Sequence, residues 1–101
     1  MTTPIYHIVT EEEYNRQRSK EHYIHESLNL EGFIHCSFEE QINGVLKRYF
    51  KNADSLMLLR ITTEKLTAKY VIEPSTGSVL YPHVYGPINW DSVEEAYKII
   101  R

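Results

Sequence analysis

Two short motifs place an imidazole and a hydroxyl two residues apart. In EGFIHCS these groups belong to His35 and Ser37, and in YPHVYGP they belong to His83 and Tyr85. Side chains two residues apart on a strand point to the same face of a sheet. If the two strands are neighbours, the four side chains line one cleft, where imidazoles can carry protons and hydroxyls can hydrogen-bond to a ligand. These four residues are the candidate catalytic residues.

Strands must position both motifs. The run GFIHC predicts a strand over 32–36, and SVLYPHVY predicts another over 78–85. Pro82 has no backbone N–H, so we expect the second strand at a sheet edge or with a bulge.

Ser37 also has a structural interpretation, because it precedes an amphipathic segment. Ser37 and Glu40 form a capping-box pattern, and apolar residues recur with helical spacing over 38–51. A serine hydroxyl in this position accepts hydrogen bonds from the first turn of the helix. We expect Ser37 to cap this helix, and a residue at the start of a helix can also contact an anionic ligand.

Three further residues have structural interpretations as well. Cys36 shares its strand face with apolar neighbours, which is typical of a small buried side chain and not of a reactive thiolate. His7 alternates with apolar residues in a predicted strand over 4–9, so we expect it in the core or at the rim of a cleft. Glu73 ends a predicted strand over 69–73, directly before the turn PSTG, where acids are commonly solvated.

The five histidines do not have the spacing of a metal site. His22 and His25 are three residues apart, as on one helix face, but no third ligand follows at a zinc-site spacing. Ser37 also lacks the flanking glycines of a serine nucleophile at a strand–helix turn. The sequence therefore predicts neither a metal centre nor a serine-nucleophile elbow.

The remaining segments complete the expected fold. Thr10 and the residues behind it predict a capped, exposed helix over 11–20, and SLMLLRI predicts a buried central strand over 55–61. Residues 91–100 fit a helix and a strand equally well. Strands and helices alternate at first and are followed mainly by strands, which indicates an α+β fold with a mainly antiparallel sheet and two to three helices.

The composition limits the classes of partner. The 101 residues suit a single domain over 1–101, and the formal net charge of −3 without a basic run argues against nucleic acid. The single cysteine, the lack of a signal-peptide pattern and the lack of a membrane-length apolar run indicate a cytoplasmic protein without a membrane partner. The oligomeric state stays open.

Five segments, taken in order, resemble the motifs of a family of small bacterial proteins that is known as domain of unknown function 952. The segments are IYHI, SLNLEGFIHCS, LMLLRI, YVIEP and YPHVYGPIN. The resemblance covers essentially the whole chain. It implies a small split sheet with a cleft, similar to a reduced ADP-ribosyltransferase fold.

This likeness implies NAD as the candidate cofactor. The resemblance places His7 at the first core-strand position that holds NAD in those enzymes and the HCS motif at the second, with Glu73 or Tyr85 at a third. His7 and Glu73 are therefore the candidate cofactor-binding residues.

We expect a polar cleft that binds or transforms a nucleotide- or NAD-related small molecule. If the protein is an enzyme, the resemblance implies a transferase or hydrolase acting on such a substrate. Two alternatives stay open: a non-catalytic sensor of a small ligand, and a protein-interaction module that uses the eight tyrosines and Trp90.

Overall fold

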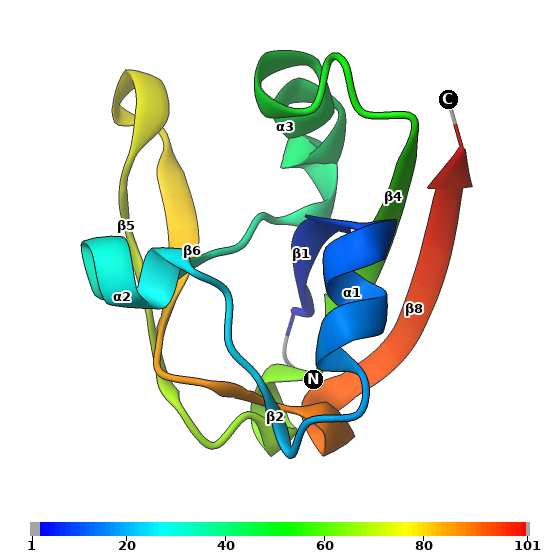
Figure 1. Ribbon diagram of the computed structural model, residues 1–101. Coiled ribbons are helices and arrows are strands. Elements are labelled where there is room, and N and C mark those ends of the chain that lie inside the picture. Colours follow the sequence, from blue (N-terminus) through cyan, green and yellow to red (C-terminus); the bar gives the residue numbers. More distant parts are fainter. Residues whose placement is uncertain (1–2, 101) are drawn as a thin grey trace.

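A computed structural model describes residues 3–100 of the chain (Figure 1). Within these residues the α-helices are α1 (Glu11–Gln17), α2 (Ser27–Glu31) and α3 (Ile42–Tyr49). The strands are β1 (Ile5–Thr10), β2 (His22–Tyr23), β3 (Ile34–His35), β4 (Ser55–Ile61), β5 (Lys69–Pro74), β6 (Leu80–Tyr85), β7 (Ile88–Asn89) and β8 (Val93–Ile100). The described α-helices thus all lie in the first half of the chain, as the sequence pattern predicts.

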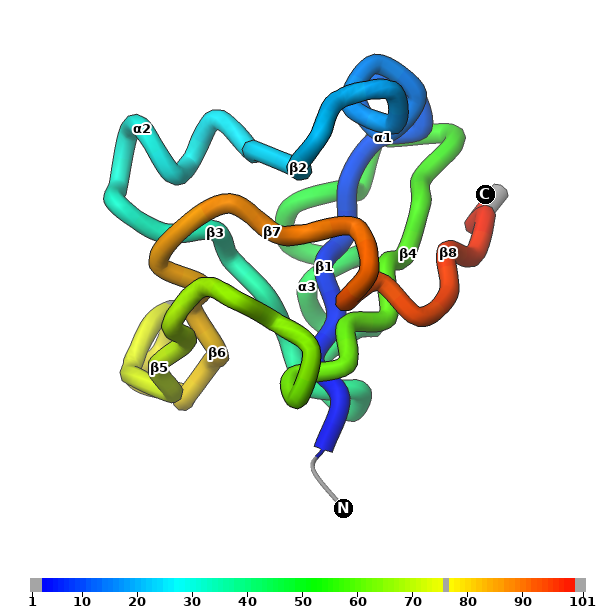
Figure 2. Tube along the Cα trace, turned by 90° about the horizontal axis from the view of Figure 1, so that it is seen from below, coloured from blue at the N-terminus to red at the C-terminus, as the bar shows by residue number. Residues whose placement is uncertain are grey.

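The strands form two three-stranded sheets and one two-stranded sheet, and every described strand pair is antiparallel. The larger sheets have the orders β1-β4-β8 and β3-β6-β5, and β2 pairs with β7. Figures 1 and 2 show β8 and the β5–β6 hairpin on opposite sides of the molecule, with β1 between them. The predicted α+β class, with mainly antiparallel sheets and three α-helices, is confirmed.

An isolated bridge between Tyr6 and Ser37 links the two larger sheets. The N–H of Tyr6 donates to the carbonyl of Ser37 at 2.8 Å, and the N–H of Ser37 donates to the carbonyl of Tyr6 at 2.7 Å. The two residues that follow β3, Cys36 and Ser37, therefore connect the β3-β6-β5 sheet to the β1-β4-β8 sheet.

Thr10 caps α1 as predicted. Its Oγ1 accepts the N–H of Glu13 at 3.2 Å. The Glu13 carboxylate does not accept a hydrogen bond from the backbone N–H of Thr10, as a full capping box requires. It accepts instead from Gln17 Nε2 at 2.8 Å and from Arg16. The helix ends at Gln17 and not at residue 20.

The prediction that Ser37 caps the next helix is wrong. The chain first makes a 3₁₀ turn over Glu39–Gln41, and the N–H of Phe38 donates to Gln41 Oε1 at 2.9 Å. The backbone of Ser37 is already bonded to Tyr6, so Ser37 ends an extended segment and does not begin a helix. Its hydroxyl forms no hydrogen bond within residues 3–100 and faces a cavity.

The prediction that Pro82 lies at a sheet edge or bulge is also wrong, because β6 is the central strand of its sheet. The carbonyl of Pro82 accepts the N–H of Cys36 at 3.1 Å, but Pro82 has no N–H to return. The β3–β6 ladder therefore stops opposite Pro82. This stop lets the chain leave β6 at Cys36 and pair with β1 at Ser37.

The ambiguous segment 91–100 forms β8, which pairs with β4 along its length. Strand β4 lies between β1 and β8 and is the predicted central strand. The core between the sheets contains Ile5, Ile34, Leu59, Ile61, Val84 and Ile88. Among the described helices, none has the length and hydropathy needed to span a membrane.

Candidate functional site

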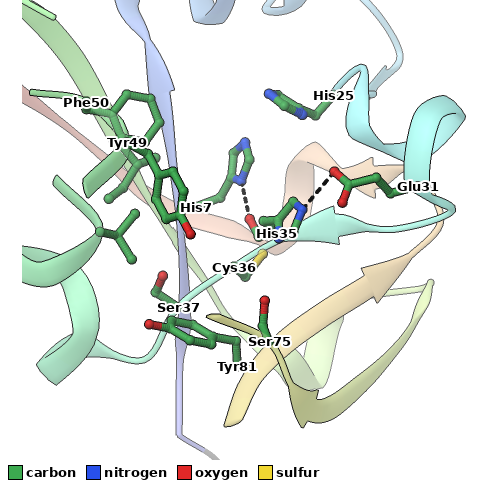
Figure 3. Close-up of a pocket in the computed structure, with 12 residues that line it drawn as sticks. His7, His25, Glu31, His35, Cys36, Ser37, Tyr49, Phe50, Ser75 and Tyr81 are labelled. Carbon is green, nitrogen blue, oxygen red and sulfur yellow. Dashed lines mark hydrogen bonds and ion pairs between the residues drawn. The ribbon is translucent and has the colours of Figure 1, made fainter. Parts of the chain in front are cut away.

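A cavity of about 500 Å³ lies where β1, β3, α3 and the tip of the β5–β6 hairpin meet (Figure 3). Its lining combines imidazoles, hydroxyls and aromatic rings. The residues that line it are His7, Ile8, His25, Glu31, His35, Cys36, Ser37, Val45, Tyr49, Phe50, Ser75 and Tyr81. None of these described residues is a lysine or an arginine.

His7 lies at the centre of the cavity wall with both ring nitrogens bonded. Nδ1 is 2.7 Å from the carbonyl oxygen of His35, and Nε2 is 2.7 Å from the hydroxyl of Tyr23. A carbonyl can only accept, so Nδ1 carries the proton and Nε2 accepts from the Tyr23 hydroxyl. Burial, with the nearby His25 as the next cause, lowers the pKa of His7 from 6.5 to about 3. His7 is therefore a neutral, buried histidine that offers a ligand only its ring surface.

His25 and His35 present complementary polar atoms to the cavity. His25 Nδ1 accepts the N–H of Ser27 at 3.1 Å, so in the neutral ring Nε2 carries the proton and can donate. Burial lowers the pKa of His25, which favours this neutral form. His35 Nε2 lies 2.9 Å from Glu31 Oε2, and in the neutral tautomer that carries its proton on Nε2, Nδ1 is an acceptor. The cavity thus contains one imidazole donor and one imidazole acceptor.

Aromatic rings form the opposite side of the cavity. Figure 3 shows Tyr49 and Phe50, at the end of α3, facing His7 across the cavity. Arg48 donates from Nη2 to the hydroxyl of Tyr81 at 2.7 Å and so ties α3 to β6. A planar ligand can therefore contact aromatic surface on one side and polar groups on the other.

Cys36 is buried, as predicted, with 3% of its surface exposed. Burial raises the pKa of its thiol, because the apolar surroundings disfavour the thiolate. The thiol therefore stays protonated and does not supply a nucleophile at neutral pH.

A second hollow of about 410 Å³ shares Ile8, His25 and Phe50 with the cavity. This hollow includes Arg16 and Lys20, which are cations of a kind that the lining of the cavity lacks. The ammonium of Lys20 forms no ion pair within the described part of the chain, whereas Arg16 is paired with Glu13.

The structure divides the four candidate catalytic residues between two places. His35 and Ser37 line the cavity, whereas His83 and Tyr85 lie outside it. The expected proximity of the two histidines is nevertheless present, because they are cross-strand partners with 5.4 Å between ring centroids. The ring of Phe33 stacks on His83 and separates it from solvent.

Glu73 also lies outside the cavity, although the family resemblance implies a position at the cofactor. Its carboxylate accepts from the hydroxyl of Tyr85, which lowers the pKa of Glu73 and raises that of Tyr85. His7, the other candidate cofactor-binding residue, does line the cavity.

Sequence reasoning misses much of the cavity lining. The sequence suggests His25 only as a metal ligand, and Tyr49 and Phe50 only as part of the apolar face of a helix. Their sequence signal is weak, because aromatic residues at helical spacing are typical of core packing. No group of three or more His, Cys, Asp or Glu side chains within residues 3–100 is arranged to hold a metal ion.

Solved structures of one other protein have the same fold. Two crystal structures of protein CC0527 from Caulobacter crescentus match with TM-scores of 0.83, at 28% identity for the protein itself and 26% for a double mutant of it. Each match covers 95% of this chain and 85% of the other. A solution NMR structure of CC0527 matches with a TM-score of 0.73 and 25% identity, over 95% of this chain and 84% of that one.

Sequence comparison identifies the family. No functionally curated protein matches the chain significantly. A family model described as protein of unknown function (DUF952) matches residues 8–96, which is most of the chain. With the structural likeness to CC0527, this match shows that the chain belongs to the DUF952 family.

Proposed function

We propose that the cavity binds the nucleoside part of a nucleotide- or NAD-related small molecule. One observation carries this proposal: a single cavity of about 500 Å³ joins aromatic rings to an imidazole donor and an imidazole acceptor. Cavities for small ligands have volumes of roughly 300–1,000 Å³ and contain a few well-placed polar groups. A base can stack on Tyr49 or Phe50 while ribose hydroxyls bond to His25, His35 and Ser37.

The charges of the side chains that line the cavity favour binding of an uncharged part of the ligand there. Glu31 is the one formally charged side chain among the described lining residues, and His7 is held neutral. A phosphate beside Glu31 would be repelled, whereas a base and a ribose would not. Phosphates of the same ligand would meet cations only in the second hollow, where Arg16 and Lys20 lie together with Glu13 and Glu26, and where Lys20 is the cation without an ion pair among the described residues.

The family resemblance supports the NAD-related part of the proposal. The resemblance to an ADP-ribosyltransferase fold implies a small split sheet with a cleft, and this cavity lies where two sheets meet at Ser37. In this proposal His35 and Ser37 contact the ligand. His7 positions them, because its nitrogens bond to Tyr23 and to the backbone of His35.

Binding without chemistry is the second candidate function, and the state of the lining favours it. His7 is neutral with both nitrogens bonded, and the thiol of Cys36 is protonated. Neither group can act as a strong base or nucleophile in this state. A ligand sensor needs the same cavity but no activated group.

A thermal-shift titration with adenosine, AMP and NAD tests the proposed function. A ligand present at a hundred times its dissociation constant adds about 2.7 kcal/mol of stability, which a melting curve detects readily. We expect adenosine to raise the melting temperature, and AMP and NAD to raise it further if the second hollow takes phosphate. His25→Ala and Tyr49→Ala should reduce the adenosine shift.

Lys69→Gln provides the matched control, since this exposed residue lies outside both hollows. It should leave the adenosine shift unchanged. If none of the three ligands stabilises the wild-type protein at millimolar concentration, the proposed nucleoside site is ruled out. Incubation with NAD, followed by chromatography of the products, then separates a transforming enzyme from a sensor.

A further inference from the structure

Three side chains on one face of the β3-β6-β5 sheet surround the ring of Phe33. This ring stacks on His83 with 4.0 Å between centroids and 16° between planes. It also contacts the rings of His35 at 4.9 Å and Tyr85 at 5.5 Å. We call His35, His83 and Tyr85 the aromatic box, and Phe33 fills it.

His83 is buried in this box without hydrogen bonds. It is 3% exposed, and neither of its ring nitrogens has a hydrogen-bond partner within the described residues. Nδ1 lies 3.3 Å from Glu73 Oε1, but the geometry is not that of a hydrogen bond. A buried polar group without a partner destabilises a fold. The imidazole of His83 is therefore poorly suited to lie beneath a phenyl ring.

We infer that the aromatic box binds a planar aromatic heterocycle, and that Phe33 occupies the place of this ring until the ligand displaces it. Phe33 supplies the stacking surface but has no polar atom. A heterocycle with a ring nitrogen or an amide group preserves the stacking on His83 and adds the polar atom that a phenyl ring lacks. Once Phe33 moves, a polar substituent or a water molecule can reach the ring nitrogens of His83.

The chain around Phe33 permits this movement. Phe33 is only partly buried, and His35 and Tyr85 beside it are exposed, so the box opens to solvent. Gly32 precedes Phe33 and ends α2 with a φ of +90°, and no heavy atom lies within 4 Å of the position that a Cβ would take. Ile34 remains buried on the other face of the sheet. The Phe33 ring can therefore leave the box without disturbing the core.

The inference does not depend on the proposed nucleoside site, although His35 belongs to both places. His83 contributes to the box but does not line the cavity, whereas His25 lines the cavity but is not part of the box. Substitutions of His83 and of His25 therefore test the two sites separately. A ligand with two ring systems could occupy both sites, with His35 between them.

Phe33→Ala vacates the box and provides the test. The variant and the wild type are titrated with pyridine, benzamide and benzene, and the imidazole resonances of His83 are followed by NMR. We expect pyridine and benzamide to bind the variant about tenfold more tightly than the wild type, because Phe33 no longer competes. We also expect benzene to bind the variant about tenfold more weakly than pyridine.

Two further variants separate the box from a nonspecific hole. Phe38→Ala removes another partly buried phenylalanine and should show no preference for pyridine over benzene. Adding His83→Leu to Phe33→Ala should abolish that preference, whereas adenosine binding to the cavity should be unchanged. If Phe33→Ala does not fold, Phe33→Leu removes the aromatic ring while keeping an apolar side chain.

Equal binding of benzene and pyridine to the vacated box would overturn the inference, because it would show only a hole that a ring can fill. A preference for pyridine that survives in the His83→Leu background would also overturn it. Failure of adenosine to bind, with the pyridine preference intact, would overturn the nucleoside site and leave the box in place.

Discussion

Two histidines of this protein are equally buried and have opposite hydrogen-bonding states. His7 and His83 are each 3% exposed. Both nitrogens of His7 are bonded, to the backbone of His35 and to the hydroxyl of Tyr23, whereas neither nitrogen of His83 is bonded within residues 3–100. Burial alone therefore does not distinguish a structural histidine from a candidate binding residue, but the state of the two nitrogens does.

The difference has an energetic meaning. The bonds of His7 join β1 to β3 and to β2, so the imidazole stabilises the junction of the sheets. The imidazole of His83 is covered by Phe33 and has no such hydrogen bonds, and its one polar contact among the described residues is that of Nδ1 with Glu73 Oε1 at 3.3 Å. A residue that lowers the stability of a fold is commonly one that the function requires. Four predictions test this contrast.

The largest effect is expected for His7→Leu. This change leaves the part-buried carbonyl of His35 and the buried hydroxyl of Tyr23 without their partner, at about 1–3 kcal/mol each. We expect the free energy of unfolding to fall by roughly 3–5 kcal/mol, measured by urea denaturation. The half-buried His22, which forms neither of these bonds, provides the control, since substitutions near the surface usually change stability by less than about 0.5 kcal/mol. A loss for His7→Leu no larger than that for His22→Leu would show that the two bonds do not stabilise the fold.

The second effect is a pH dependence. The pKa of His7 is about 3 in the folded protein and 6.5 in the unfolded chain, so between these values only the unfolded chain binds the proton. The stability is therefore complete above pH 6.5 and falls as the pH decreases towards 3. Between pH 7 and pH 5 we expect a loss of about 2 kcal/mol, since each pKa unit corresponds to about 1.4 kcal/mol.

Urea titrations at several pH values measure this loss, and His7→Gln is the comparison because glutamine does not titrate. The lowered pKa of His25 acts in the same direction and remains in both proteins. The difference between the wild type and His7→Gln in the slope of unfolding free energy against pH is therefore caused by the titration of His7. Parallel curves for the wild type and His7→Gln would show that His7 is not neutral by burial.

A smaller effect is expected for Tyr23→Phe. This change removes one hydroxyl and leaves His7 Nε2 unpaired while preserving the packing of the ring. The free energy of unfolding should fall by about 1–2 kcal/mol. Thermal unfolding of Tyr23→Phe and of Tyr97→Phe, whose hydroxyl donates to the exposed Glu95, compares a buried with an exposed phenol. An equal effect of both changes would contradict the assigned Tyr23–His7 bond.

The smallest effect, and one of opposite sign, is expected for His83→Leu. This change removes a buried polar group that forms no hydrogen bond within the described residues, at the loss of the 3.3 Å contact of Nδ1 with the Glu73 carboxylate. We expect the stability to stay the same or to rise by up to about 1 kcal/mol. A loss of more than about 2 kcal/mol, which is what an unpaired buried polar group costs, would show that His83 has structural bonds like those of His7. The two histidines would then be equivalent.

Local patterns succeed where the structure depends on neighbours in the sequence. The apolar run over 55–61 forms the central strand β4, and Thr10 caps α1. Alternation correctly predicts the burial of Cys36. These features depend on contacts within a few residues, or on the burial of an entire segment, so composition and period are sufficient to predict them.

Two of the failed predictions involve distant partners. Ser37 has every local sign of a helix cap, but its backbone bonds to Tyr6 in the first strand of the chain. Pro82 has the local sign of an edge strand, but its missing N–H only ends one ladder of a central strand. In both cases a long-range hydrogen bond overrode a local preference.

The sequence by itself determined the α+β class, the central strand β4, and the strand faces that His35 shares with Phe33 and that His83 shares with Tyr85. These follow from alternation and from segment hydrophobicity, which are properties of the chain. Only the tertiary structure decided that Phe33 covers His83, that His7 is bonded on both sides and that Tyr49 and Phe50 face a cavity. These depend on strand order and register, which bring together residues that are far apart in the chain and that no local period relates.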